Sequence, residues 1–316
     1  MSDSAVQAAA DGRLAVEAAG LRFQNPIVLA AGTAGYGREL AGVVELDRLG
    51  GIVTKAVSPA PRAGAPAPRV AEFEGGMINA VGLANPGLDE VRREQLPWLS
   101  SLSRARVLVN VVGSAVEDYA TVVEGLDGTD GAHAFELNVS CPNVRAGGME
   151  FGADPRTLAD VVRGARAATR RPLFVKLSPT LPDIAASART AVDAGADGLT
   201  LVNTIPGLVI DVERRRPALG FGSGGVSGTG LLPIGVLATW KVSRAVRVPL
   251  MGVGGVSATE HVLQYVLAGA SLVGVGTAAM QDPRLPERLV RGLERWCDRH
   301  GVRALSELVG ALEWPA

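Results

Sequence analysis

Cysteine is almost absent from this chain of 316 residues, which contains only Cys141 and Cys297. Two thiols cannot build the set of disulfides that small secreted proteins rely on, and this suits a reducing cytoplasm. They also cannot supply the four thiolates that an iron–sulfur cluster normally takes. The sequence therefore predicts neither a disulfide framework nor an iron–sulfur centre within this chain.

The chain also lacks an excess of charge and any long apolar run. Its 31 basic and 32 acidic residues leave a net charge of −1, without the basic stripe of a nucleic-acid-binding surface. No stretch approaches 18 uncharged apolar residues, and the N-terminus lacks the features of a signal peptide. We expect a cytoplasmic protein that binds neither nucleic acid nor a membrane.

Lysine and asparagine are scarce as well. Only three of the 31 basic residues are lysines, and the chain has only seven asparagines. We infer that arginine and aspartate occupy the ordinary surface positions instead. The lysines and asparagines that remain are therefore expected where arginine or aspartate would not serve.

Short aliphatic runs recur along the chain in place of long ones. Each has the length of a strand, and most are almost entirely apolar, which is typical of parallel strands covered on both faces. Helical patterns lie between them, for example at 155–170, 181–195 and 257–270. The sequence predicts a (β/α)8 TIM barrel rather than a doubly wound open sheet. The eight strand runs are 27–32, 51–56, 106–113, 134–140, 173–179, 198–204, 249–255 and 272–278.

We expect a single domain over residues 1–316, with residues 1–13 as a loose N-terminal extension. Gly20 separates two short apolar runs within 14–26, which predicts a hairpin that caps the barrel floor. The connections 57–105 and 205–248 are longer than a normal loop between a strand and a helix. In a barrel, long insertions after strands build the active-site face.

The scarce residues fall inside or at the carboxyl ends of five predicted strands. A buried ammonium or amide is costly there unless something pairs with it. Neighbouring groups of the barrel could satisfy one such residue, but five on one face favour a bound polar ligand. These residues are Lys55, Asn110, Asn138, Lys176 and Asn203, the last followed by Thr204.

Glycines end the last two predicted strands. They occupy 252–255 and 274–277, after strands seven and eight, the usual phosphate site of this fold. A third glycine-rich segment lies at 224–230. Together with the lysines and asparagines, the glycines indicate a cofactor that carries a phosphate and a polar ring system, such as FMN.

Cys141 lies directly after the fourth predicted strand, in the segment Asn-Val-Ser-Cys-Pro-Asn that begins at Asn138. A thiolate in a loop on the active-site face could act as a nucleophile or as a general base. Cys297 lies in a helical stretch, where we interpret it as a small buried hydrophobic residue. The three histidines match no metal-binding spacing, so we predict no metal site.

These motifs together resemble one family, the dihydroorotate dehydrogenases, from about Leu14 to Ala279. The resemblance rests on NPIVLAAG, TKA, GGMINAVGLANPG, NVSCPN, VKLSP, NTIPGLVID, GGVSG and GVGG followed by VGT. It implies an FMN enzyme that oxidises (S)-dihydroorotate to orotate in pyrimidine biosynthesis. One departure is Ala31, where the family usually has serine and therefore a further hydrogen bond to the flavin.

The resemblance also implies roles for individual residues. Cys141 matches the general base, which takes the C5 proton while hydride passes from C6 to the flavin. The matching substrate contacts are Lys55, Asn79, Ala80, Val81, Gly82, Leu83, Asn138, Asn143, Asn203 and Thr204. The matching flavin and phosphate contacts are Lys55, Ala56, Asn110, Asn138, Lys176, Val202, Gly228, Gly254, Gly255, Gly276 and Thr277.

A cysteine at the base position resembles the class 1 enzymes, and the segment from Asn203 to Pro217 resembles type 1B. That type implies a homodimeric core within a heterotetramer, in which a separate subunit with FAD and a 2Fe-2S cluster passes electrons to NAD⁺. Type 1A, a homodimer that reduces fumarate, is the alternative. Two further alternatives are a related FMN barrel acting on another dihydropyrimidine and a non-catalytic flavin-binding subunit.

Overall fold

The structure, a computed structural model, describes residues 12–140, 142–143 and 149–315. Eight parallel strands form a closed barrel, in which the last strand pairs again with the first. Each predicted strand run contains one of them, so the predicted (β/α)8 barrel is confirmed. In barrel order, the strands are β3 (Ile27–Leu29), β4 (Gly51–Val53), β7 (Arg106–Val111), β8 (Ala134–Asn138), β11 (Leu173–Leu177), β12 (Gly198–Leu201), β17 (Leu250–Val253) and β18 (Leu272–Val275).

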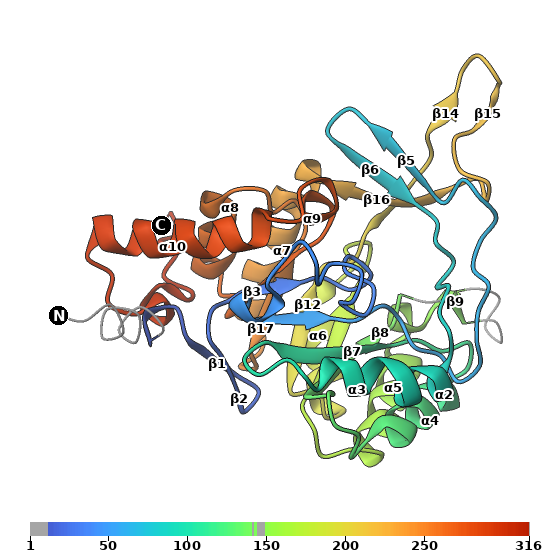
Figure 1. Cartoon of the computed structure of the whole chain (residues 1–316), viewed down its shortest axis with the longest axis horizontal. Coiled ribbons are helices and arrows are strands. Elements are labelled where there is room, and N and C mark those ends of the chain that lie inside the picture. Colours follow the sequence, from blue (N-terminus) through green and yellow to red (C-terminus); the bar gives the residue numbers. More distant parts are fainter. Residues whose placement is uncertain (1–11, 141, 144–148, 316) are drawn as a thin grey trace.

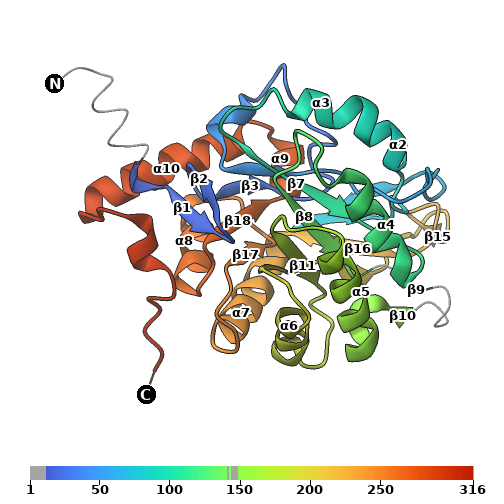
Figure 2. The ribbon, with the colours of Figure 1, turned by 90° about the horizontal axis from the view of Figure 1, so that it is seen from below.

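Helices cover the outside of the barrel (Figures 1 and 2). The longer ones are α4 (Val116–Leu126), α5 (Pro155–Ala167), α6 (Ile184–Asp193), α7 (Leu232–Ser243), α8 (Thr259–Leu267) and α10 (Leu285–His300). Asp154 and Asp183 cap α5 and α6, because their carboxylates accept the backbone N–H groups of Thr157 and Ala186 at 2.8 and 2.9 Å. Each predicted helical run contains one of these helices.

Shorter elements lie between the barrel units. A continuous helical stretch runs through α2 (Leu88–Glu90), a π-helical turn (Val91–Gln95) and α3 (Leu96–Leu99). The others are β9 (Pro142–Asn143), β10 (Met149–Glu150), α9 (Thr277–Gln281) and the 3-10 turns Leu46–Arg48, Phe151–Ala153, Thr229–Leu231 and Leu305–Leu308.

An apolar cluster fills the lower interior of the barrel. Inward-facing side chains such as Leu108 and Phe174 pack there against Val16 and Phe23 of an N-terminal hairpin. The hairpin consists of the antiparallel strands β1 (Val16–Ala18) and β2 (Leu21–Phe23), visible in Figure 2. Phe23 is completely buried. The predicted hairpin at the barrel floor is therefore confirmed.

The two long insertions meet in one small sheet. β5 (Val70–Phe73) and β6 (Gly76–Asn79) come from the first insertion, and β13 (Ile205–Gly207) and β16 (Gly224–Gly228) come from the second. They form a four-stranded antiparallel sheet in the order β13-β16-β6-β5. Figure 1 shows this sheet on one side of the barrel, with the hairpin of β14 (Ile210–Asp211) and β15 (Arg216–Pro217) projecting beyond it.

Some sequence predictions concern residues outside the described part of the chain. Residues 1–11 of the expected N-terminal extension, Cys141 and residues 144–148 belong to this group. Within the ranges that the structure describes, no helix is both long and apolar enough to cross a membrane.

Asp47 links the connection between β3 and β4 to the start of β7. Its carboxylate accepts the backbone N–H groups of Ser103, Arg104 and Ala105 at 3.0, 2.8 and 2.9 Å. Burial alone would raise the pKa of Asp47, but the bonds from Ala105, Ser103 and Arg104 outweigh it and hold the pKa below its usual range. The charged side chain therefore stabilises the fold.

We expect Asp47→Asn to lower the free energy of unfolding at neutral pH by about 1–3 kcal/mol, because backbone donors lose a charged acceptor. A pKa that folding lowers adds stability above the ordinary aspartate range, and this stability is lost as the pH falls through the lowered value. Denaturant unfolding should therefore show a smaller difference between the two proteins in acid. Asp130→Asn, at an exposed turn, serves as the control. A pH-independent difference would contradict this account.

Candidate active site

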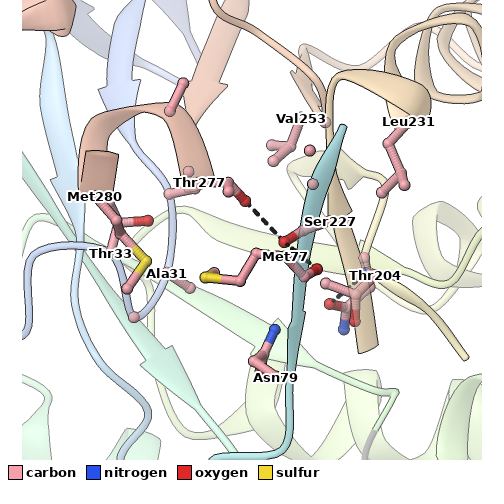
Figure 3. Close-up of a pocket in the computed structure, with 18 of the residues that line it drawn as sticks. Ala31, Thr33, Met77, Asn79, Thr204, Ser227, Leu231, Val253, Thr277 and Met280 are labelled. Atoms are coloured by element: carbon pink, nitrogen blue, oxygen red, sulfur yellow. Dashed lines mark hydrogen bonds between the residues drawn. The ribbon is translucent and has the colours of Figure 1, made fainter. Parts of the chain in front are cut away.

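A large cavity lies at the carboxyl ends of the barrel strands. Its volume is about 670 Å³, within the range of small-molecule and cofactor sites. The insertion sheet contributes Met77, Asn79 and Ser227 to its lining, which Figure 3 shows beside Thr204 and Thr277. Every barrel strand, or the segment directly after it, also contributes: Ala31 after β3, Lys55 after β4, Asn110 on β7, Asn138 on β8, Lys176 on β11, Asn203 after β12, Gly254 after β17 and Gly276 after β18.

Most of the residues that the sequence singled out lie around this cavity. Among the expected substrate contacts, the lining includes Lys55, Asn79, Val81, Leu83, Asn138, Asn203 and Thr204. Among the expected cofactor contacts, it also includes Ala56, Asn110, Lys176, Val202, Gly228, Gly254, Gly255, Gly276 and Thr277. Ala80 and Gly82 alternate with lining residues and are not part of the lining. Cys141 and the side chain of Asn143 lie outside the described part of the chain.

The amides of Asn138 and Asn203 are held together at the centre of the site. Nδ2 of Asn203 donates to Oδ1 of Asn138 at 3.2 Å, and the backbone N–H of Ser140 donates to the same oxygen at 3.3 Å. Oδ1 of Asn203 accepts the backbone N–H of Thr204 at 2.9 Å. Both carbonyl oxygens accept bonds within the site, and one N–H of Asn203 is committed to Asn138. The N–H groups of Asn138 and the second N–H of Asn203 are left for a ligand. The pair therefore suits carbonyl or carboxylate oxygens.

Two lysines bring positive charge to the cavity. Lys176 is 7% exposed and Lys55 is partly buried. The segment that carries Lys55 is fixed, since its backbone N–H donates to Gly35 O at 2.8 Å. A buried ammonium is costly unless an anion or several acceptors pair with it. Both positions therefore favour a ligand with anionic or carbonyl groups.

Glycines line the cavity after the last two strands. Gly254 and Gly255 have φ values of +125° and +72°, which L side chains rarely adopt, and a Cβ on Gly255 would lie 2.5 Å from Leu232 N. In front of Gly276 the space is open, because the atom nearest to an added Cβ would be Thr33 Oγ1 at 3.7 Å. Bare backbone after strands seven and eight suits a phosphate group.

All three tyrosines of the chain support the backbone of this cavity from behind. Each is at most 5% exposed, and burial raises the pKa of Tyr36 and Tyr265, so these hydroxyls remain donors. Each hydroxyl donates to the carbonyl of a cavity residue: Tyr36 to Ala56 at 3.0 Å, Tyr119 to Asn138 at 2.9 Å and Tyr265 to Gly254 at 2.9 Å. The sequence analysis missed all three, because nothing in their local motifs marks them.

Ser140 is a further cavity residue that sequence reasoning missed. Its Oγ is buried without a hydrogen-bond partner, the one such side-chain atom among the residues that the structure describes. It lines the cavity, and an unpartnered buried hydroxyl there indicates a ligand. Serine is common in this chain, so scarcity could not single out Ser140. Its position directly before Cys141 could have done so.

Sequence comparison agrees with this geometry. The model of the dihydroorotate dehydrogenase family matches residues 13–296. The chain belongs to the dihydroorotate dehydrogenase family. The motif resemblance and the prediction of an oxidoreductase are thereby confirmed.

The dehydrogenases to which the chain is similar are of type B. It is 45% identical over 300 residues to the dihydroorotate dehydrogenase B (NAD(+)), catalytic subunit, of Pelobacter propionicus, covering 95% of this chain and 98% of that protein. It is 46% identical over 298 residues to the protein of the same name from Geobacillus kaustophilus, covering 94% and 95%. The predicted similarity to class 1B catalytic subunits is confirmed.

Ala31, where the resemblance leads us to expect a serine in the family, lies in the cavity lining. Its methyl group offers no hydrogen bond. Thr33 also lines the cavity two residues later and retains a hydroxyl on this segment.

Among the described residues, no three His, Cys, Asp or Glu side chains gather as a metal-binding group.

We expect Tyr265→Phe to destabilise the protein by about 1 kcal/mol and to weaken binding of the expected cofactor, FMN, because the Gly254 carbonyl loses its support. Denaturant unfolding and FMN titration of the apoprotein measure the two effects. Tyr119→Phe is the matched control, since it removes the same hydroxyl behind Asn138. There, binding of the expected substrate should weaken as well as binding of the cofactor, because Asn138 is an expected contact of both, whereas Gly254 is an expected contact of the cofactor alone. If both variants lost affinity for the same ligands to the same extent, the different ligand contacts assigned to Gly254 and Asn138 would be contradicted.

Proposed function

We propose that this chain oxidises (S)-dihydroorotate to orotate with bound FMN, as a step of pyrimidine synthesis, and that the chain works as a single domain. The observation that carries the proposal is the cavity itself. In it, scarce lysines and asparagines from five barrel strands lie together with the glycines that follow the last two strands. The chain that forms it belongs to the dihydroorotate dehydrogenase family.

The cavity residues fit FMN. Lysines and amides suit the oxygens and ring nitrogens of an isoalloxazine, and exposed backbone suits a phosphate. FMN supplies the acceptor for the hydride. The residues that would hold its ring are Lys55, Ala56, Asn110, Asn138, Lys176 and Val202, and those that would hold its phosphate end are Gly228, Gly254, Gly255, Gly276 and Thr277.

The amide side chains are suited to the substrate. Dihydroorotate carries two ring carbonyl groups, ring N–H groups and a carboxylate, and the N–H groups of Asn138 and Asn203 can donate to its oxygens. Asn79 approaches from the insertion sheet, where its Nδ2 donates to Gly225 O at 3.3 Å and keeps Oδ1 as an acceptor. The Lys55 ammonium would pair with the carboxylate, which favours dihydroorotate over dihydrouracil.

Cys141 is our candidate for the general base. Its assignment rests on its place in the family motif, directly after Ser140. In the described part of the chain on either side of it, Tyr119 donates to the Asn138 carbonyl, and β9 pairs with β10. The thiolate would take the proton from C5 as the hydride leaves C6, so that the C5–C6 double bond of orotate forms.

We further propose that electrons reach NAD⁺ through a separate subunit that carries FAD and a 2Fe-2S cluster, with a homodimeric core inside a heterotetramer in the cytoplasm. Two observations support this. Relatives that are 45–46% identical carry the name of an NAD(+) enzyme's catalytic subunit. With only two cysteines, the chain cannot itself bind such a cluster.

The acceptor is tested by anaerobic turnover of the purified chain with dihydroorotate, comparing NAD⁺, fumarate and an artificial dye. We expect reduction of the dye but of neither natural acceptor, because the route to NAD⁺ needs the second subunit. Rapid fumarate reduction would overturn the NAD⁺-linked proposal in favour of type 1A. If FMN is bound but the dye stays oxidised, dihydroorotate is not the substrate.

We expect Cys141→Ser to retain FMN and to lose about 10²–10⁴-fold in turnover at neutral pH, because a hydroxyl ionises far less readily than a thiol. Cys297→Ser is the matched control. Cys297 is buried in α10, away from the cavity lining, so this variant should keep wild-type turnover. Wild-type turnover in Cys141→Ser would remove Cys141 from the role.

The same assignment predicts the direction of the pH dependence. A free thiol titrates near ~8.5, and only its thiolate accepts a proton. The rate of flavin reduction by dihydroorotate, followed by stopped-flow absorbance, should therefore increase with pH until the thiolate is formed. A flat profile from mildly acidic to alkaline pH would contradict a thiolate base.

A further inference from the structure

Glu136 is a carboxylate inside the barrel, next to the cavity but not part of its lining. It lies on β8 two residues before Asn138 and is 1% exposed. Two donors hold it: Nδ2 of Asn110 on β7 lies 2.8 Å from Oε1, and Oγ1 of Thr200 on β12 lies 2.7 Å from Oε2. Asn110 is itself 1% exposed, and it does line the cavity.

The polar layer that contains Glu136 separates the apolar floor of the barrel from the cavity. Across β7 and β8, Leu108 pairs with Ala134 in the lower layer, and Asn110 pairs with Glu136 in the layer above. The lower pair belongs to the apolar interior cluster. Aliphatic side chains normally fill both layers of such a barrel. A carboxylate at this level is therefore a departure from the usual packing.

Glu136 shares the barrel interior with a buried cation. Lys176 lies on the neighbouring strand β11, where it pairs in register with Asn138, two residues beyond Glu136. Lys176 is 7% exposed. The carboxylate and the ammonium thus occupy successive layers, and the charge of one lowers the electrostatic effect of the other at the cavity.

Stability alone does not account for this carboxylate. Burying the carboxylate has a desolvation cost, which the two hydrogen bonds offset without a net gain in stability. An aliphatic side chain of similar volume would pack there without that cost. The carboxylate's hydrogen-bond partner Asn110, however, lines the cavity. One N–H of Asn110 is committed to Glu136, which fixes the amide plane and leaves Oδ1 and the second N–H for a ligand.

We propose that Glu136 is a positioning residue for the flavin, which holds the Asn110 amide in its binding orientation and lowers the midpoint potential of bound FMN through its negative charge. The inference rests on the proposed function, since it needs FMN in the cavity. A negative charge disfavours the addition of electrons nearby. The bound flavin is thereby a weaker oxidant and passes its electrons on more readily.

The test is Glu136→Gln, which keeps the shape but removes the charge. Its Oε1 can still accept from Asn110, and its Nε2 can donate to the Thr200 hydroxyl, which then accepts instead of donating. Purified wild-type and variant proteins are loaded with FMN, and the midpoint potential is measured by equilibration with reference dyes. We expect a more positive potential in the variant. A tenfold change in the relative affinity for reduced and oxidised FMN corresponds to about 30 mV for this two-electron couple, and we expect a change of about that size.

Thr200→Val is the matched control, because it removes one hydrogen bond to Glu136 and keeps the charge. Its melting temperature should fall while its midpoint potential stays at the wild-type value. A purely structural role of Glu136 predicts lower melting temperatures in both variants and an unchanged potential in both. That result would overturn the inference, as would a lower potential in Glu136→Gln.

Glu136→Asp provides a second test, which applies even if the glutamine variant does not fold. It keeps the charge but withdraws the carboxylate from Asn110 by one methylene group. FMN should bind to it at least about tenfold more weakly, a loss of about 1.4 kcal/mol, and wild-type affinity would overturn the positioning role. A wild-type chain that binds no FMN would instead refute the proposed function, so the two failures are distinguishable.

Discussion

Closure of the parallel barrel is the constraint on which the rest of the structure depends. Parallel strands in a closed ring all end at the same rim, so residues scattered between Ala30 and Gln281 meet around one cavity. No strand needs to be long for this, and β3 and β4 have only three residues each. The two insertions then close the rim from above with a sheet that neither could form alone.

The rim is held from two sides. Outside the strands, the three tyrosine hydroxyls bind backbone carbonyls of cavity residues. Inside the barrel, Glu136 binds the Asn110 amide, and the apolar floor below it is sealed by Phe23 of the hairpin. Preorganised polar groups of this kind need little rearrangement when a ligand binds, which is how a protein site gains both affinity and electrostatic control.

The architecture and much of the site could be predicted from the sequence. Aliphatic runs of strand length located all eight barrel strands, and the scarcity of lysine and asparagine located Lys55, Asn110, Asn138, Lys176 and Asn203 around one cavity. These signals worked because a buried amide or ammonium stands out in an apolar run. The predicted runs extend beyond the strands, and in six of them the carboxyl-terminal residues belong to the cavity lining rather than to the sheet. The ends of the runs 106–113 and 173–179 belong to neither.

The supporting residues could not be predicted in the same way. Glutamate is common in this chain, so Glu136 was not marked by scarcity, although it too lies in an apolar run. Tyr119 and Tyr265 lie on helices, at positions that any buried aromatic residue could occupy. Their function depends on which carbonyl each hydroxyl reaches, and that follows from the packing of helix on strand, which sequence periodicity does not specify.

The most direct test of the central claim is an anaerobic titration of the FMN-loaded chain with (S)-dihydroorotate, followed by flavin absorbance. If the strand ends form a flavin and dihydroorotate site, the absorbance will bleach with about one equivalent of dihydroorotate per flavin, and orotate will appear in equal amount. A chain that binds FMN but stays yellow with dihydroorotate, or bleaches with dihydrouracil instead, would contradict the account.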